Sequence, residues 1–142
     1  MSQTPLQRRY NRLATAINRK AEALMAYGRV TSIDLAIIAR DHRRCAYCGI
    51  ELEPGQGTFD HVVPFNRGGR NESGNIVRCC YTCNRTKFTK TPDEHAEYME
   101  TVVECPICGR EFRPRWSQLS AGNGRFCSRS CSARSRWVDA DR

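Results

Sequence analysis

Residues 45–87 read CAYCGIELEPGQGTFDHVVPFNRGGRNESGNIVRCCYTCNRTK and contain two Cys-x-x-Cys pairs. The first pair is Cys45 and Cys48, and the second is Cys80 and Cys83. Two such pairs can close a tetrahedral four-thiolate site around a structural zinc ion, which leaves no coordination position for water or substrate. Zinc binding, worth on the order of 10 kcal/mol in small zinc peptides, can replace a missing core. We therefore predict a zinc site at these four cysteines, called the first quartet below.

Three polar residues of the same segment suit metal-assisted hydrolysis. Asp60 and His61 are adjacent between the two pairs, and Asn84 directly follows the last cysteine. Asp60 and Asn84 offer the oxygen ligands that Mg²⁺ or Mn²⁺ prefers, and so few protein ligands leave positions for water and phosphate. His61 points to the other side of an extended segment from Asp60 and can accept a proton from the attacking water. These residues predict a catalytic divalent-cation site with His61 as the general base.

The order of elements in this segment is a Cys-x-x-Cys knuckle, Asp-His-x-x-Pro, Gly-Gly, asparagine, a second knuckle and Asn-x-x-Lys. In this order the segment from Cys45 to Lys87 resembles the HNH, or ββα-metal, endonuclease family. The resemblance implies a two-stranded hairpin followed by a helix, with one divalent cation between them. It also implies hydrolysis of DNA to 5′-phosphate and 3′-hydroxyl ends.

The resemblance extends to individual residues around the predicted centre. It implies that Asn75 steadies the loop that carries His61. Asn84 replaces the histidine at the third position of the founding pattern, which is expected to shift metal preference from Ni²⁺ and Zn²⁺ towards Mg²⁺ and Mn²⁺. Lys87 lies three residues after Asn84 on the same helical face and is expected to contact the scissile phosphate. Arg85 is a weaker candidate for a backbone contact.

The C-terminal segment repeats the paired-cysteine pattern. Its cysteines, called the second quartet below, are Cys105, Cys108, Cys127 and Cys131. The last pair is spaced more loosely, but the four thiolates can still form a second closed zinc site. The segment resembles the short zinc-ribbon or treble-clef modules that are appended to many phage and mobile-element proteins.

Arginines of this C-terminal segment predict a DNA-gripping surface. Together with Arg85, the predicted DNA contacts are Arg113, Arg115, Arg129, Arg134 and Arg136. A stability module with a solvated basic face is the alternative interpretation of the same residues.

Basic charge is concentrated in the two flanks of the chain. Residues 1–44 hold nine Lys and Arg against three acids, residues 45–104 six against nine, and residues 105–142 eight against three. The formal net charge of +8 falls to about +4 if each quartet binds zinc as four thiolates. A polyanionic partner is therefore favoured, although charge alone does not identify it.

Hydrophobic spacing and capping residues predict the main helices. Apolar residues three and four apart predict a helix over about Pro5–Tyr27, and Thr31 with Asp34 caps a second helix that ends near Arg40. The sequence Thr91-Pro92-Asp93-Glu94 starts a further helix to about Val103, with His95 expected at its surface.

The lack of an apolar h-region at the N-terminus and of a membrane-length apolar run favours a cytoplasmic location, which is a reducing compartment. If the gene comes from a phage, this is the host cytoplasm. Paired cysteines are then read as metal ligands before disulfides. Cys79 belongs to neither quartet and is expected to be a buried or free thiol.

The sequence as a whole predicts an α+β, zinc-stapled protein in three parts. Residues 1–44 form a basic helical arm, residues 45–103 a ββα-metal nuclease core, and residues 104–142 a zinc-binding, DNA-binding module. The predicted function is metal-dependent hydrolysis of duplex DNA, with no membrane partner. A non-cleaving DNA-binding or assembly module and an RNA-processing nuclease are the alternatives. A homodimer and phage packaging or homing partners remain open, as do the target sequence and nicking versus double-strand cutting.

Overall fold

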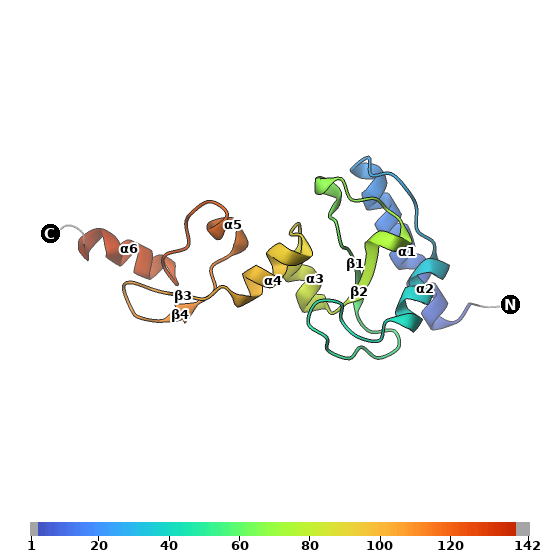
Figure 1. Cartoon of the computed structure of the whole chain (residues 1–142), viewed down its shortest axis with the longest axis horizontal. Coiled ribbons are helices and arrows are strands. Elements are labelled where there is room, and N and C mark those ends of the chain that lie inside the picture. Colours follow the sequence, from blue (N-terminus) through green and yellow to red (C-terminus); the bar gives the residue numbers. More distant parts are fainter. Residues whose placement is uncertain (1–2, 139–142) are drawn as a thin grey trace. The chain divides into compact units, whose positions relative to one another are not determined.

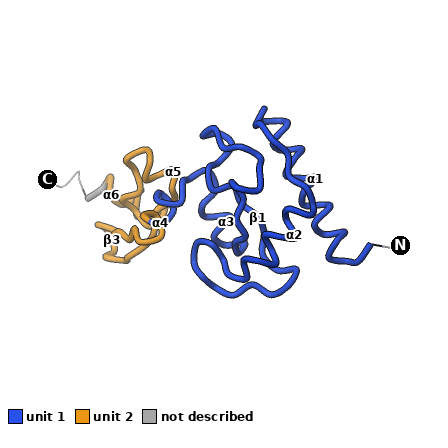
Figure 2. Tube along the Cα trace, turned by 45° about the vertical axis from the view of Figure 1, so that its right-hand side comes forward, with its two compact units in different colours: residues 1–96 blue, residues 97–142 orange. Residues whose placement is uncertain are grey.

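The computed structural model describes residues 3–138 of the chain. It divides into two compact units, residues 1–96 and residues 97–142 (Figure 2). The described residues combine helices with two small antiparallel sheets (Figure 1), which confirms the α+β class. No helix within them is long and apolar enough to span a membrane.

Helix α1 (Pro5–Ala23) opens the first unit with a capping box. The Thr4 side chain accepts from the Gln7 amide, and the Gln7 side chain accepts from the Thr4 amide. The predicted extension of this helix to Tyr27 is wrong. The chain leaves helical geometry after Ala23 and reaches a φ of 53° at Met25, which a continuing α-helix does not allow.

Helix α2 (Ser32–Asp41) begins at the predicted cap, where Thr31 and Asp34 bond each other's backbone amides. Its end lies one residue beyond the predicted one. The helix packs against α1, and both share one apolar core with the strand that begins at Ile76. The buried members of this core are Tyr10, Ala14, Val30, Leu35, Ile38, Ala39 and Ile76.

Strands β1 (Thr58–His61) and β2 (Ile76–Cys79) form an antiparallel pair in which Asp60 lies opposite Val77. Helix α3 (Tyr81–Lys87) follows β2 almost directly and contacts β1. Because Ile76 belongs to the apolar core, the pair is fixed to the two N-terminal helices. The apolar core therefore anchors the two strands, and α3 packs against β1.

The connection from β1 to β2 contains two 3₁₀ turns, η1 (Phe65–Arg67) and η2 (Ser73–Asn75). Gly69 is buried in this connection, and a Cβ added there would lie 1.8 Å from the Val63 carbonyl oxygen. Only glycine allows the loop to fold back this closely on its own start.

Helix α4 (Pro92–Glu100) crosses from the first unit into the second and begins at the predicted box of Thr91 and Glu94. The predicted end near Val103 is wrong, because strand β3 (Val103–Glu104) already begins there.

In the second unit, β3 pairs with β4 (Glu111–Phe112) in an antiparallel sheet. Helices α5 (Trp116–Leu119) and α6 (Arg129–Val138) follow. These short elements surround the second quartet, which supplies Cys105 and Cys131 as two of the unit's few buried side chains.

Candidate active site and metal centres

The first quartet brings its four sulfur atoms together within 4.8 Å of one another. The sulfurs of Cys48 and Cys80 lie 3.9 Å apart. A tetrahedral zinc ion with bonds of about 2.3 Å would separate its sulfurs by about 3.8 Å. Burial opposes ionisation of Cys45, but amide N–H groups, above all that of Cys80, donate to its sulfur and lower its pKa to about 7. In size and in donor type, the quartet could hold zinc.

The second quartet has the same compact geometry, again with its sulfurs within 4.8 Å. Cys127 lies 3.5 Å from Cys108 and 3.7 Å from Cys131, measured between sulfurs. A hydrogen bond from the Cys127 amide is the main cause that lowers the pKa of Cys105 to about 6. Cys79 lies outside both groups and is fully buried in β2, as expected.

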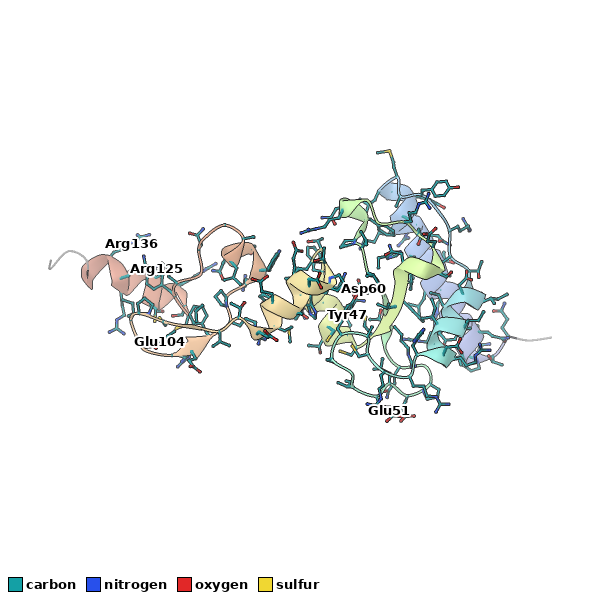
Figure 3. All side chains as sticks on the ribbon, viewed as in Figure 1. Tyr47, Glu51, Asp60, Glu104, Arg125 and Arg136 are labelled. Atoms are coloured by element: carbon teal, nitrogen blue, oxygen red, sulfur yellow. The ribbon has the colours of Figure 1, made fainter. Side chains whose placement is uncertain are left out.

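Asp60 projects from β1 and is held by two donors on one oxygen. The Tyr47 hydroxyl donates to Oδ2 at 2.6 Å, and the Lys87 ammonium approaches the same oxygen at 2.9 Å. Figure 3 labels Tyr47 and Asp60 side by side. Since both contacts use Oδ2, Oδ1 is the oxygen that Asp60 can offer to a metal ion.

Tyr47, which sequence analysis overlooked, lies between the two cysteines of the first knuckle. Burial and its bond to Asp60 raise its pKa, so the hydroxyl remains a donor. Its ring contacts His95 at 5.3 Å between centroids.

The expected surface position of His95 is wrong. Its ring is buried between Tyr47 and Thr86, whose Oγ1 lies 3.0 Å from the imidazole Nε2.

Asn84 reaches back from α3 to the strand that carries Asp60. Its amide nitrogen lies 3.3 Å from the Thr58 hydroxyl oxygen and donates to the Phe59 carbonyl oxygen at 3.2 Å. These bonds turn the amide nitrogen towards β1, so Oδ1 is the atom that Asn84 can offer to a cation. A carboxylate and an amide oxygen form a donor set that suits Mg²⁺ or Mn²⁺.

Lys87 is completely buried, with 0% of its side chain exposed. Its ammonium contacts Asp60 and donates to the His61 carbonyl oxygen at 2.8 Å. A direct contact with a phosphate would require these bonds to open, because the ammonium faces into the protein. The structure thus brings Lys87 to the predicted centre as an internal brace, and its phosphate contact stays a prediction.

His61 ends β1 and is partly buried. Its ring lies 4.1 Å from that of Phe65, and its Nε2 lies 3.1 Å from Oδ1 of Asn71. Burial is the main cause that lowers the pKa of His61 below 6.5, and the charges of Lys20 and Lys87 act in the same direction. The bond to Asn71 and the charge of Asp60 oppose this shift. The ring is therefore neutral, and able to accept a proton, at neutral pH.

Asn75 holds the start of the loop after His61. Its side chain accepts from the Val63 amide at 2.9 Å and donates to the carbonyl oxygens of Val63 and Arg70 at 3.0 and 2.8 Å. These are the contacts that a loop-steadying role requires.

Asn71 and Asn18 also lie at this centre, and sequence analysis overlooked both. Asn71 donates to Oδ1 of Asn18 at 2.8 Å, although the two are 53 positions apart. A polar residue on the buried face of α1, among Ala14 and Ala21, was the signal that could have identified Asn18.

The predicted DNA contacts are exposed arginines in both units. Arg85 is exposed on α3, and Arg134 and Arg136 are exposed on α6. Arg113 is partly engaged within the protein, since it donates to the carbonyl oxygens of Met99 and Thr101.

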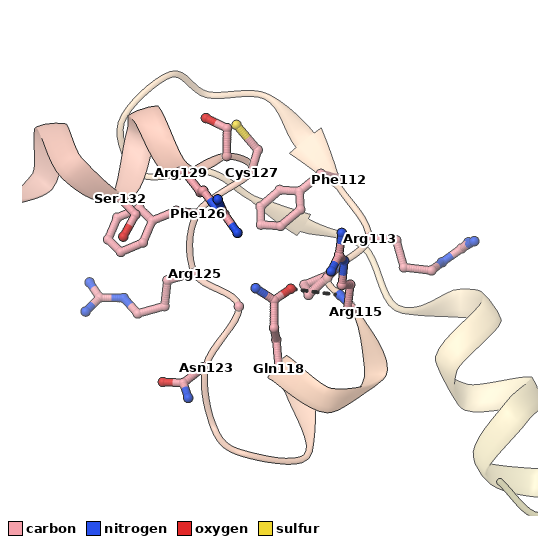
Figure 4. Close-up of a pocket in the computed structure, with 13 residues that line it drawn as sticks. Phe112, Arg113, Arg115, Gln118, Asn123, Arg125, Phe126, Cys127, Arg129 and Ser132 are labelled. Carbon is pink, nitrogen blue, oxygen red and sulfur yellow. Dashed lines mark hydrogen bonds between the residues drawn. The ribbon is translucent and has the colours of Figure 1, made fainter. Parts of the chain in front are cut away.

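A cavity of about 680 Å³ in the second unit gathers several of these side chains (Figure 4). None of the described residues that line it is acidic. Its arginines are Arg113, Arg115, Arg125 and Arg129. A cavity of this composition can accept anionic groups.

Comparisons with known proteins bear on the segment that holds the centre. Residues 45–100 match a family model described as HNH endonuclease. The chain is also 31% identical over 86 residues to the CRISPR-associated endonuclease Cas9 of Corynebacterium diphtheriae. That match covers 58% of this chain and only 8% of the length of the Cas9 protein. The segment that carries Asp60, His61 and Asn84 is therefore similar in sequence to HNH endonucleases.

Proposed function

We propose that the chain is a metal-dependent endonuclease that hydrolyses phosphodiester bonds of duplex DNA. The observation that carries the proposal is the position of Lys87, whose ammonium binds both the Asp60 carboxylate and the His61 carbonyl oxygen. The same short helix supplies Asn84, which bonds to β1. The Asp60 carboxylate, the His61 backbone and the Asn84 amide are thus joined through one strand and one helix, and a preorganised active site needs such support.

Each residue has a distinct role in this proposal. Asp60 and Asn84 would hold the divalent cation through their carboxylate and amide oxygens. A bound Mg²⁺ or Mn²⁺ neutralises phosphate charge and assists the departing sugar oxygen. His61 accepts the proton of the attacking water, and Asn75 keeps the loop behind it in place. Lys87 holds Asp60 in place through their ion pair.

The proposed substrate is DNA, bound largely through its phosphates. The net charge, formally +8 and about +4 with zinc at both quartets, and the arginine-lined cavity of the second unit support a polyanion. Binding is then expected to weaken steeply with salt because bound counterions are released. The two quartets would each hold a structural zinc ion.

Incubation of the zinc-loaded full chain with supercoiled plasmid or structured RNA, with Mg²⁺, Mn²⁺ or EDTA, tests the proposal. Cleavage of the plasmid with either metal, but not with EDTA, is expected. His61→Ala should lower the rate by about 10²–10⁴-fold while retaining both zinc ions. His42→Ala, which removes an exposed histidine outside the site, serves as the matched control.

The other outcomes decide between the alternatives. Binding of DNA without cleavage under every metal condition would identify a non-cleaving module. Selective cleavage of RNA would identify an RNA-processing nuclease. If plasmid is cut, the ratio of nicked to linear product against protein concentration measures whether one copy or two act together.

A further inference from the structure

A chain of buried side-chain amides connects helix α1 to the proposed general base. Asn18 on α1 and Asn71 in the β1–β2 connection are 6% and 0% exposed. Asn71 contacts Nε2 of His61 through its Oδ1 and donates to Asn18 through its Nδ2. Buried polar groups of this kind are costly unless every hydrogen bond is made.

The direction of each bond is fixed by the backbone of Val30. Its N–H can only donate, and it donates to Oδ1 of Asn18 at 3.1 Å. Its carbonyl can only accept, and it accepts from Nδ2 of Asn18 at 2.8 Å. With Asn18 oriented in this way, Asn71 must present Nδ2 to Asn18 and Oδ1 to His61.

The same logic determines the protonation pattern of the imidazole. An amide oxygen faces Nε2 of His61, so Nε2 must carry the proton that makes this bond. In the neutral ring the lone pair then belongs to Nδ1.

We propose that Asn71, oriented by Asn18, is a positioning residue that fixes His61 with Nε2 protonated and Nδ1 available to accept the proton of water. The inference rests on the proposed function for the role of His61 as a base. It makes α1 part of the active site, although α1 lies outside the segment that matches the HNH endonuclease model.

Backbone contacts show that Asn71 is held tightly in its position. Its backbone N–H donates to the Tyr27 carbonyl oxygen at 2.7 Å. A Cβ added at Gly28, where φ is 103°, would lie 2.7 Å from the carbonyl oxygen of Asn71. The chain after α1 therefore grips Asn71 from its backbone side, while Phe65 lies against the imidazole ring.

Nitrogen-15 NMR of the histidine side chains in the zinc-loaded full chain tests the protonation pattern directly. The spectrum is recorded at a pH where His61 is neutral, and the His61 signals are assigned by their loss in His61→Gln. The expected result is an Nε2–H proton that exchanges slowly with water and an unprotonated Nδ1. A wild-type spectrum with the proton on Nδ1 overturns the inference, whatever the activity.

Two substitutions at Asn71 separate positioning from general stability. Asn71→Leu removes the acceptor, so the slow-exchanging proton should disappear and kcat should fall about 10–100-fold with little change in KM. Asn71→Asp keeps an acceptor for Nε2–H but loses the bond to Asn18. It should therefore keep the slow-exchanging proton and more activity than Asn71→Leu, even if it is less stable. Equal loss of the proton signal in both variants contradicts the inference.

Substitutions on α1 test the remote end of the chain of amides. Asn18→Ala should accelerate exchange of the Nε2–H proton and lower kcat. Asn11→Ala is the matched control, because Asn11 lies on the same helix and, within the described part of the chain, its side chain bonds to that of Gln3 at 3.0 Å. Identical behaviour of the two variants overturns the role of Asn18. If the wild-type protein cleaves no substrate but its Nε2–H exchanges slowly, the assigned protonation of Nε2 is supported. That outcome contradicts only the proposed function.

Discussion

The two units use the same paired-cysteine device in different surroundings. The first unit contains an apolar core that joins two helices and a strand, and its quartet contributes to a second buried cluster with Leu52 and Cys79. Among residues 97–136 of the second unit, only Cys105, Pro114 and Cys131 are buried. We therefore expect the first unit to retain much of its fold through apolar burial, and the second unit to depend on the zinc ion proposed at its quartet. A charged catalytic centre needs the stiffer support, and the proposed centre is in the first unit.

The largest expected effect comes from removing the second quartet. The double substitution of Cys105 and Cys108 by Ser should lose one zinc ion and unfold the second unit, because zinc binding is worth on the order of 10 kcal/mol. Amide NMR signals of the first unit should persist. Zinc stoichiometry and the amide spectrum measure both effects, and Cys79→Ala should retain both ions. Dispersed amide signals from a zinc-free second unit would show that this unit folds without zinc, which would contradict the expected difference between the two units.

A smaller but still large effect is expected for Lys87, whose ammonium binds Asp60 in the first unit. Lys87→Met leaves the Asp60 carboxylate without its buried partner, so the free energy of unfolding should fall by about 3–5 kcal/mol. Cleavage should be lost as well. Arg85→Met removes an exposed cation from the same helix and should change stability by no more than about 0.5 kcal/mol. Urea unfolding with zinc present measures both, and equal midpoints would contradict the bracing role.

The pH dependence of cleavage should follow the chemistry of the first unit. Because the pKa of His61 is lowered, the neutral base persists below pH 6.5 and is lost only as pH falls further. Below that pKa, kcat/KM should fall about tenfold per pH unit. Single-turnover rates, with zinc content checked at each pH, give the profile. An acid limb centred above pH 6.5 would contradict the assignment.

The smallest effect is expected for single arginines of the second unit. Arg129→Gln should weaken DNA binding equally for all sequences and lower the salt slope by about 1, with kcat unchanged. Arg113→Gln should differ, since it also removes bonds to the carbonyl oxygens of Met99 and Thr101. Binding titrations at several salt concentrations test both. An unchanged salt slope for Arg129→Gln would favour the alternative of a solvated basic face.

Local signals predicted the starts of structural elements well. The caps at Thr31 and Thr91 bond three residues ahead, so the sequence alone contains both partners. The family resemblance also implied a two-stranded hairpin, and β1 and β2 form an antiparallel pair. Helix ends were predicted less well. The two helices predicted to end at Tyr27 and Val103 end at Ala23 and Glu100.

Contacts between distant residues explain what the sequence did not predict. Lys87 follows Asn84 by one helical turn, which suggested a phosphate contact, but its burial depends on how α3 packs on β1. From the sequence of its own helix, His95 was expected at the surface. Its burial depends on the ring of Tyr47, which is distant in the sequence. The bond between Asn18 and Asn71 joins two segments whose proximity depends on the assembled core.

The location of Tyr47 connects the first quartet, where zinc is proposed to bind, to the proposed catalytic centre. Its hydroxyl donates to Asp60, while its backbone lies between Cys45 and Cys48, two ligands of the proposed zinc ion. Stripping zinc from this knuckle would release the hydroxyl and loosen the carboxylate, even with abundant magnesium. Zinc depletion is then expected to lower the proposed cleavage through Asp60, without displacing the catalytic cation directly.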